Sequence, residues 1–261
     1  MEENKEKSGR KVYEMLRGNM LDLIYEPGST FVKRYGREPG REISRYFVDL
    51  IDKNKIDEKK EALLYSKIEN CCRKICMMDY AGIEAINTER DFILTQNREC
   101  PCLIWEDEIK MLYHLEAMIL FGRAALDIAA YFFSSFLIKP YGETRFDSFN
   151  KLSKHILGSN DKNLLKLKEL LERLGEDELS TYRLLCGCER GRSLRDIVAH
   201  QTIIRIEYLE TKEKSEKEYC HIIINKQPIP LESFIYSICS EVIDIFSTIE
   251  DLIIDIHKIT K

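Results

Sequence analysis

A long apolar segment in the middle of the chain most constrains the fold. Residues 117–138 read AMILFGRAALDIAAYFFSSFLI, which is long enough to span a bilayer as a helix. Arg123 and Asp127 lie near its middle, and each costs roughly 2.5–3.5 kcal/mol on an insertion scale. We therefore expect the central helix of a soluble bundle, over about 106–138, and no membrane span.

The composition favours a mainly α protein. Only 12 of the 261 residues are Gly and 6 are Pro, whereas 44% are hydrophobic, so long helices around a sizeable core are expected. The formal net charge of −5 gives no overall nucleic-acid signature, and such a role would have to come from local patches. The N-terminus is charged and lacks the apolar core of a signal peptide, which predicts a cytoplasmic chain.

The nine cysteines predict reduced thiols rather than a metal site. CPC at 100–102 and CGC at 186–188 lack the CxxC spacing that suits a zinc knuckle. We expect the cysteines to be small buried apolar residues, and we expect neither a metal nor another cofactor.

Hydrophobic periodicity predicts helices along most of the chain. They are expected at 12–25, 45–54, 57–86, 106–138, 146–157, 161–174, 176–190, 193–201 and 231–258, the last with its acids on the outer face. Alternation at 203–209 and the run YCHIII at 219–224 predict one small antiparallel hairpin, at about 203–224. Pro101 marks a boundary between an N-terminal helical region with a basic loop, 1–105, and a helical bundle with the hairpin, 106–261.

A seam of polar residues is predicted on the central helix. At about 100° per residue, Glu116, Arg123, Asp127 and Ser134 fall within roughly 40° of one another. Because unpaired charge is very costly inside a protein, these groups must be paired or must line a cleft. Two interpretations stay open: an Arg123–Asp127 i,i+4 pair with partners on a neighbouring helix, or the floor of a polar site.

The sequence RSLRDIVAHQ at 192–201 carries the main candidate site. Projected as one helix, it places Leu194, Ile197, Val198, Gln201 and Ile204 on a core face, and Arg192, Asp196 and His200 on the opposite face beside Arg195. Ser193 and Asp196 also fit a capping box. Between 183 and 205, five arginines (183, 190, 192, 195 and 205) stand against two acids, and clustered guanidinium groups suit phosphate binding. A solvated helix face is the alternative interpretation.

Arg195 and His200 together could cleave RNA without a metal. A histidine, with an unperturbed pKa of about 6.5, can move a proton from a 2′-hydroxyl or to a leaving oxygen. An arginine can stabilise the charged phosphorane. Residues five apart on one helix point about 140° apart, so the two side chains would have to converge in a groove between two copies. The chemistry therefore predicts a homodimer.

The stretch RDIVAH, at 195–200, resembles the R-x(4–6)-H motif of HEPN-domain proteins. The long apolar helix with internal charges and the closing amphipathic helix are similar too, and the resemblance covers roughly 106–258. It implies an HEPN-like helical bundle, a homodimer and a metal-independent endoribonuclease of toxin–antitoxin or defence systems, with RNA as substrate and an antitoxin protein as a partner. Arg195 and His200 would be catalytic, with Asp196 and Arg192 in support.

Two features depart from the plainest pattern of that family. Asp196 stands where asparagine is frequent, and the hairpin separates the motif helix from the last helix. Two other interpretations therefore stay open. One is a non-catalytic HEPN module that binds nucleotide, RNA or a partner protein, and the other is a helical scaffold of unrelated descent whose arginines contact an acidic protein.

A second basic cluster bears on RNA binding. The stretch FVKRYGREPGREISRY, at 31–46, interleaves its basic residues with the aromatic residues Phe31, Tyr35 and Tyr46, a pattern that suits single-stranded RNA. The candidates for RNA contact are Lys33, Arg34, Arg37 and Arg41, together with Arg190. A solvated loop with its aromatics in the core is the alternative.

Overall fold

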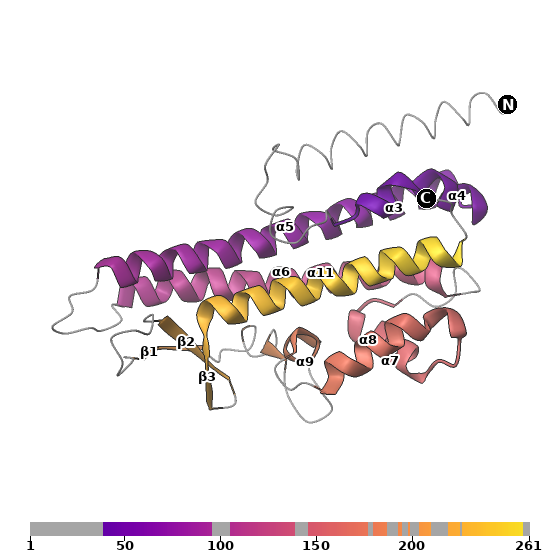
Figure 1. Cartoon of the computed structure of the whole chain (residues 1–261). Helices are drawn as coiled ribbons and strands as arrows, with labels where there is room; N and C mark the ends of the chain where they lie inside the picture. Colours follow the sequence, from indigo (N-terminus) through magenta and orange to yellow (C-terminus); the bar gives the residue numbers. More distant parts are fainter. Residues whose placement is uncertain are drawn as a thin grey trace. The chain divides into compact units, whose positions relative to one another are not determined.

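The computed structural model describes residues 39–95, 105–138, 146–176, 180–186, 193–194, 198, 204–209, 219–224 and 226–257. Within these residues the protein is mainly α, with one small three-stranded antiparallel sheet (Figure 1), which confirms the predicted fold class. The chain divides into two compact units. The first unit comprises Met1–Cys76, Ala124–Glu176 and Val242–Lys261, and the second unit Met77–Arg123 and Asp177–Glu241. The predicted division at residue 105 stays a prediction.

Three long helices each contribute residues to both units: α5 (Glu58–Thr95), α6 (Trp105–Leu137) and α11 (Leu231–Ile256). The first unit adds the shorter elements α3 (Arg41–Arg45), α4 (Phe47–Lys53), α7 (Phe149–Gly158), η1 (Lys162–Leu164) and α8 (Leu165–Glu176). The second unit adds α9 (Thr181–Cys186) and the three strands. The helix predicted at 12–25 lies outside the described residues.

Aromatic side chains fill the core of the first unit. Phe132, Phe133 and Phe136 of α6 are at most 2% exposed and meet edge to face. Phe133 also contacts Phe246 of α11, with ring centroids 5.1 Å apart. Burying one such ring typically contributes 3–5 kcal/mol, as judged by truncation to Ala. These contacts explain why α6 is apolar on several sides.

Glycine permits a close approach of helices in the second unit. A Cβ at Gly82 of α5 would lie 2.7 Å from Ile235 Cγ2 of α11 and 3.2 Å from Met118 Sδ of α6. A Cβ at Gly122 of α6 would lie 2.9 Å from Met78 Sδ of α5. The three long helices therefore lie side by side in this unit (Figure 1), and at Gly82 the contact leaves no room for a side chain.

The sheet has the strand order β1-β2-β3, with β1 at Arg205–Leu209, β2 at Tyr219–Ile224 and β3 at Gln227–Pro230. β1 and β2 pair antiparallel, which confirms the predicted hairpin. The inner face is apolar, with Ile206, Cys220 and Ile222 at most 5% exposed. Lys226, at φ 67°, turns the chain from β2 into β3.

Three details of the sequence prediction were wrong. β3 was not predicted, because the two prolines of QPIP argue against a strand, yet an edge strand tolerates them on its outer side. α3 replaces part of the predicted basic loop, after Gly40 at φ 80° has turned the chain. α5 ends at Thr95 rather than near 86, because the buried side chain of Phe92 extends its core face.

The apolar character of α6 bears on whether this helix is a core helix or a membrane span. Among the described residues one helix, over Glu106–Leu137, is long and apolar enough to cross a membrane, and 56% of its most apolar window is buried inside the protein. The core helix of a soluble protein meets the same criteria.

Candidate functional site

The motif at 192–201 is described only in part. Arg190, Arg192, Arg195, Asp196 and His200 lie outside the described residues. Of the residues between them, Ser193 is 3% and Leu194 6% exposed, and Leu194 and Val198 are helical. Ser193 and Leu194 are therefore buried in the second unit.

Both flanks of the motif are anchored in the second unit. On the N-terminal side, Arg123 Nη1 of α6 donates a hydrogen bond to Leu185 O, 3.1 Å away, in the last turn of α9. A guanidinium suits this position, because the last carbonyls of a helix lack intrahelical partners and carry partial negative charge. On the C-terminal side, Ile204 is 4% exposed and leads directly into β1. Leu185 and Ile204, the described residues on the two sides of the motif, are thus held within the second unit.

The predicted polar seam divides between the two units. In the first unit, Asp127 Oδ1 accepts a hydrogen bond from Phe149 N, 2.8 Å away, at the first residue of α7. Ser148, the residue before α7, makes no side-chain cap of its own, so a carboxylate from α6 caps this helix. Ser134 is 4% exposed and donates to Tyr131 O. In the second unit, burial raises the pKa of the half-buried Glu116.

A buried acid in the second unit was missed by the sequence analysis. Glu89 of α5 is 2% exposed, and its Oε1 accepts a hydrogen bond from Cys220 N of β2 at 2.7 Å. Burial raises the pKa of Glu89 to about 7 against the opposing effect of the Cys220 N–H, while Glu232 raises it and Arg90 lowers it. The signal was present in the sequence, because Glu89 lies between Ala85 and Phe92 on an apolar stripe of helical spacing.

A second buried acid lies in the first unit, on α11. Glu250 is 0% exposed, so the expectation that the acids of this helix face outward was wrong at this position. Its Oε1 accepts from Ile43 N of α3 at 3.3 Å. Phe246 and Ile253, one turn away on either side, are both buried and place Glu250 on the core face. Its carboxyl therefore connects α11 to a helix 207 residues earlier in the chain.

The N-terminal basic cluster is also described only in part. Lys33, Arg34 and Arg37 lie outside the described residues, as do Phe31 and Tyr35. Arg41 opens α3 with an exposed side chain. Arg45 lies over the ring of Tyr46, 5.5 Å from its centroid, and Tyr46 itself is only 6% exposed. Tyr46 is therefore a core residue and presents no face for stacking on a base.

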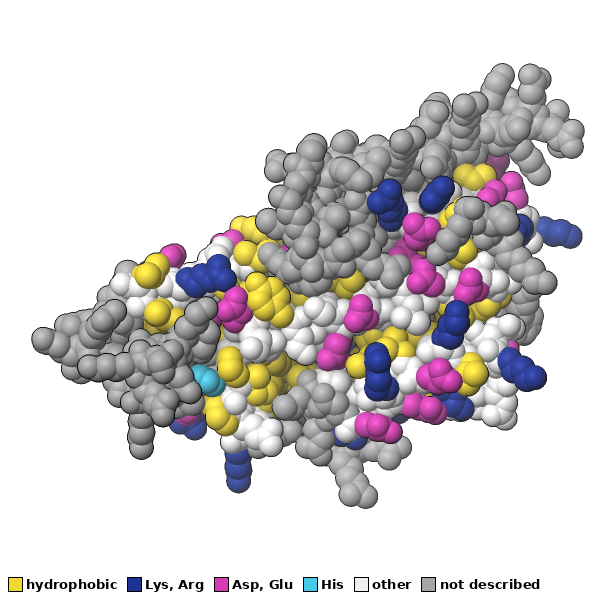
Figure 2. All heavy atoms as spheres, in the orientation of Figure 1, with side chains coloured by type: hydrophobic (Ala, Val, Ile, Leu, Met, Phe, Trp, Pro, Cys, Tyr) yellow, Lys and Arg dark blue, Asp and Glu magenta, His cyan; other side chains and the backbone are white. Residues whose placement is uncertain are grey.

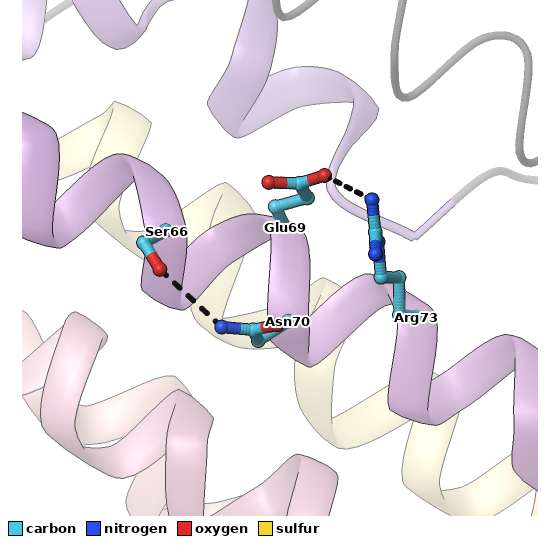
Figure 3. A network of polar contacts seen from close by, with 4 residues as sticks. All are labelled: Ser66, Glu69, Asn70 and Arg73. Atoms are coloured by element: carbon cyan, nitrogen blue, oxygen red, sulfur yellow. Dashed lines mark hydrogen bonds and ion pairs between the residues drawn. The ribbon is translucent and has the colours of Figure 1, made fainter.

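The outer face of α5 carries polar contacts of an ordinary kind. In Figure 3, Arg73 pairs with Glu69 and Asn70 Nδ2 donates to Ser66 Oγ, each one helical turn apart. In Figure 2, the described Lys and Arg side chains on the face shown are interspersed with Asp and Glu. Such a mixture is typical of a solvated surface.

The described cysteines form no metal site. No group of three or more His, Cys, Asp or Glu side chains that could hold a metal occurs among the described residues. Cys71, Cys72, Cys186, Cys220 and Cys239 are buried free thiols, while Cys100, Cys102 and Cys188 lie outside the described part of the chain. Burial raises the pKa of Cys71 and Cys72 well above the usual range and that of Cys220 to about 12, so these thiols stay protonated.

Comparison of the chain with known protein families, with curated proteins and with solved structures finds no match. The similarity to HEPN-domain proteins therefore depends on the motif at 195–200 and on its context in the sequence.

Proposed function

We propose that the protein is a metal-independent endoribonuclease of HEPN type. His200 would act as the acid/base and Arg195 would stabilise the phosphate, with Arg192 in support. The observation that carries the proposal is the Arg195–His200 spacing within an arginine-rich stretch of an otherwise acidic chain. A mainly α fold is the architecture that the resemblance requires.

The proposed reaction is an internal transesterification. The 2′-hydroxyl loses its proton and attacks the adjacent phosphorus, while the bond to the 5′-oxygen of the next nucleotide breaks and that oxygen takes up a proton. The products are a 2′,3′-cyclic phosphate and a 5′-hydroxyl. A histidine and a guanidinium supply the proton transfer and the positive charge, so the reaction requires no metal.

The described flanks of the motif support the proposal through positioning. Arg123 holds the end of α9 at Leu185, and the buried Ile204 holds the start of β1. Catalytic groups must be held within about 0.5 Å of the productive geometry, and anchored residues on both sides of the motif favour such order. We expect the groove for RNA to form between the motifs of two copies, because Arg195 and His200 diverge by about 140° on one helix.

Fewer residues of the N-terminal basic cluster are candidates for RNA contact than the sequence alone indicates. Tyr46 is buried, so in the described part of this cluster the contacts available to RNA are those of the exposed Arg41 and Arg45 to phosphates. Phosphate contacts of this kind add affinity that falls with salt and carry no sequence information.

The decisive experiment is an RNA-cleavage assay in EDTA. The wild type is expected to release 2′,3′-cyclic phosphate ends, and His200→Ala and Arg195→Ala are each expected to lower the rate by a factor of about 10² or more. His155→Ala and Arg173→Ala are matched controls, because both side chains are exposed on helices of the first unit. Equal rates for His200→Ala and the wild type, or no cleavage of any RNA, would refute the nuclease.

The alternative of a non-catalytic module is distinguished by the same proteins. It predicts RNA or nucleotide binding without cleavage, and binding that His200→Ala leaves unchanged. A partner protein such as an antitoxin would be detected by co-purification with the wild type, and removing it should release cleavage activity only if the nuclease proposal holds.

A further inference from the structure

A buried carboxyl joins a long helix to the sheet in the second unit. Glu89 of α5 is 2% exposed and accepts the hydrogen bond of Cys220 N across 2.7 Å, although the two residues are 131 positions apart. Phe92, one turn further along α5, meets Tyr208 of β1 edge to face at 5.5 Å. The end of α5 therefore holds both strands of the hairpin, and Glu89 supplies the polar part of that contact.

The backbone of Cys220 needs this acceptor because β3 is too short. β3 pairs with β2 only as far as Pro230, and α11 then begins at Leu231. Prolines at 228 and 230 have no N–H, so Ile222 of β2 occupies a hydrogen-bonded position opposite β3. Hydrogen-bonding directions alternate along a strand, so Cys220 points the same way as Ile222 but beyond the end of β3. Glu89 takes the place of the missing strand.

Charged groups from several elements surround this carboxyl. Arg90 of α5 is the neighbouring cation, but its Nη2 pairs with Glu232 of α11 at 3.0 Å, and its side chain is 59% exposed. The charge of Glu232 raises the pKa of Glu89. Burial, Glu89 and Asp107 of α6, in that order, raise the pKa of the Cys220 thiol, which stays protonated. Arg205, Glu207 and His221 belong to the opposite face of the sheet by strand alternation.

We propose that Glu89 is a proton-responsive latch, which holds the sheet on α5 when its carboxyl is protonated and loosens when the proton leaves. Both forms can accept the hydrogen bond of Cys220 N, but the ionised form must also be kept out of water. Opening of the contact hydrates the carboxylate and removes that cost. Local opening of the sheet therefore becomes easier as the carboxyl ionises.

The contact between Glu89 and Cys220 should respond to pH in the neutral range. Burial raises the pKa of Glu89 to about 7, whereas a hydrated carboxyl has its ordinary value of 4.5. A raised pKa in the closed state means that closure is fully favoured below pH 4.5 and that this advantage is lost as the pH rises through 7. Between pH 5 and pH 8 the opening equilibrium should rise by roughly 70-fold, which follows from the difference between the two pKa values.

The test is hydrogen exchange of the peptide that contains β2, followed by mass spectrometry from pH 5 to pH 8. Protection factors, corrected for the intrinsic rate, are expected to fall with pH in the wild type and to stay level in Glu89→Gln, which keeps the acceptor and removes the charge. Glu84→Gln, on the same helix, is the matched control and should behave as the wild type. Level protection in the wild type, or the wild-type slope in Glu89→Gln, would overturn the proposal.

A second measurement needs no variant. In carbon-13 NMR of the wild-type protein, the Glu89 carboxyl resonance, assigned through its connection to the backbone resonances, should titrate with a midpoint near 7. A midpoint near 4.5 for that resonance would overturn the latch, even if Glu89→Gln did not fold. Both measurements are made without RNA, so their outcome is separate from that of the nuclease proposal.

Discussion

Glu250 in the first unit and Glu89 in the second unit have the same structural role. Each lies on a long helix, is at most 2% exposed, and accepts a hydrogen bond from a backbone N–H of a short element far away in the chain. Glu250 holds Ile43 of α3, and Glu89 holds Cys220 of β2. In both units a long helix thus supplies an acceptor that the short element lacks.

The two contacts differ in what the backbone contributes. Ile43 lies in the first turn of α3, which has no side-chain cap, and a helix N-terminus carries partial positive charge that favours an anion. A strand has only a small net dipole, so Cys220 offers its single N–H. Glu250 and Glu89 therefore each fix a short element to a long helix.

The largest expected effect is that of removing the acceptor in the first unit. Glu250→Ala should destabilise the protein by about 2–4 kcal/mol, because it leaves the N–H of Ile43 without this acceptor and opens a cavity in the core. Glu250→Gln keeps an acceptor oxygen and should cost clearly less. Urea unfolding followed by circular dichroism measures both variants. A cost below about 0.5 kcal/mol for the alanine variant would show that α3 does not depend on this contact.

The next effect is the pH dependence of the contact in the second unit. The folded-state pKa of Glu89, about 7, lies above the ordinary value of 4.5, so its contribution to stability is complete below pH 4.5 and is lost as the pH rises through 7. Between pH 5 and pH 8 the wild type should lose roughly 2–3 kcal/mol relative to Glu89→Gln. Urea midpoints of the two proteins at both pH values give this difference. Parallel pH profiles would mean that the carboxyl is not closed off from water.

Hydrophobic spacing predicted the long helices because their core faces follow a regular period. The expected helices at 106–138 and 231–258 agree closely with α6 and α11, and the alternation at 203–209 identified β1. α3 was missed because Gly40 precedes it, and β3 was missed because it contains two prolines; both residue types normally interrupt regular structure. Tertiary contacts outweighed those local preferences.

The partners of the polar residues could not be predicted from spacing alone. Arg123 bonds to a carbonyl 62 residues away and Asp127 to an N–H 22 residues away, and no local pattern contains either distance. The sequence does indicate that Glu89 and Glu250 are unusual, because each is an acid on the apolar face of a helix. That pattern does not predict which backbone N–H the acid accepts a hydrogen bond from. For Arg195 and His200, the assignment stays a prediction from the sequence.

Asp127 extends the comparison to a third short element, with a smaller expected effect. It accepts from the first residue of α7, as Glu250 does from the first turn of α3, but it is only half-buried. Asp127→Ala should cost about 1 kcal/mol, the usual value of a helix cap, and Asp127→Asn should cost less because it keeps an acceptor oxygen. Unfolding in urea measures the total, and hydrogen exchange in the peptide at 149–158 should report the loss locally. Unchanged exchange there would remove Asp127 from this group of fixing residues.

The smallest effect is expected for an acid of α5 that pairs only within its own helix. Glu69 of α5, whose side chain is 19% exposed, pairs with Arg73, whose side chain is 50% exposed, one turn further along the same helix (Figure 3). Such a pair fixes no second element, and screening by water and salt limits it to about 0.3–0.5 kcal/mol. Glu69→Gln should therefore shift the free energy of unfolding by no more than that amount, and less in high salt. A cost comparable to that of Glu250→Ala would mean that charge alone, rather than the connection between distant elements, makes these acids important.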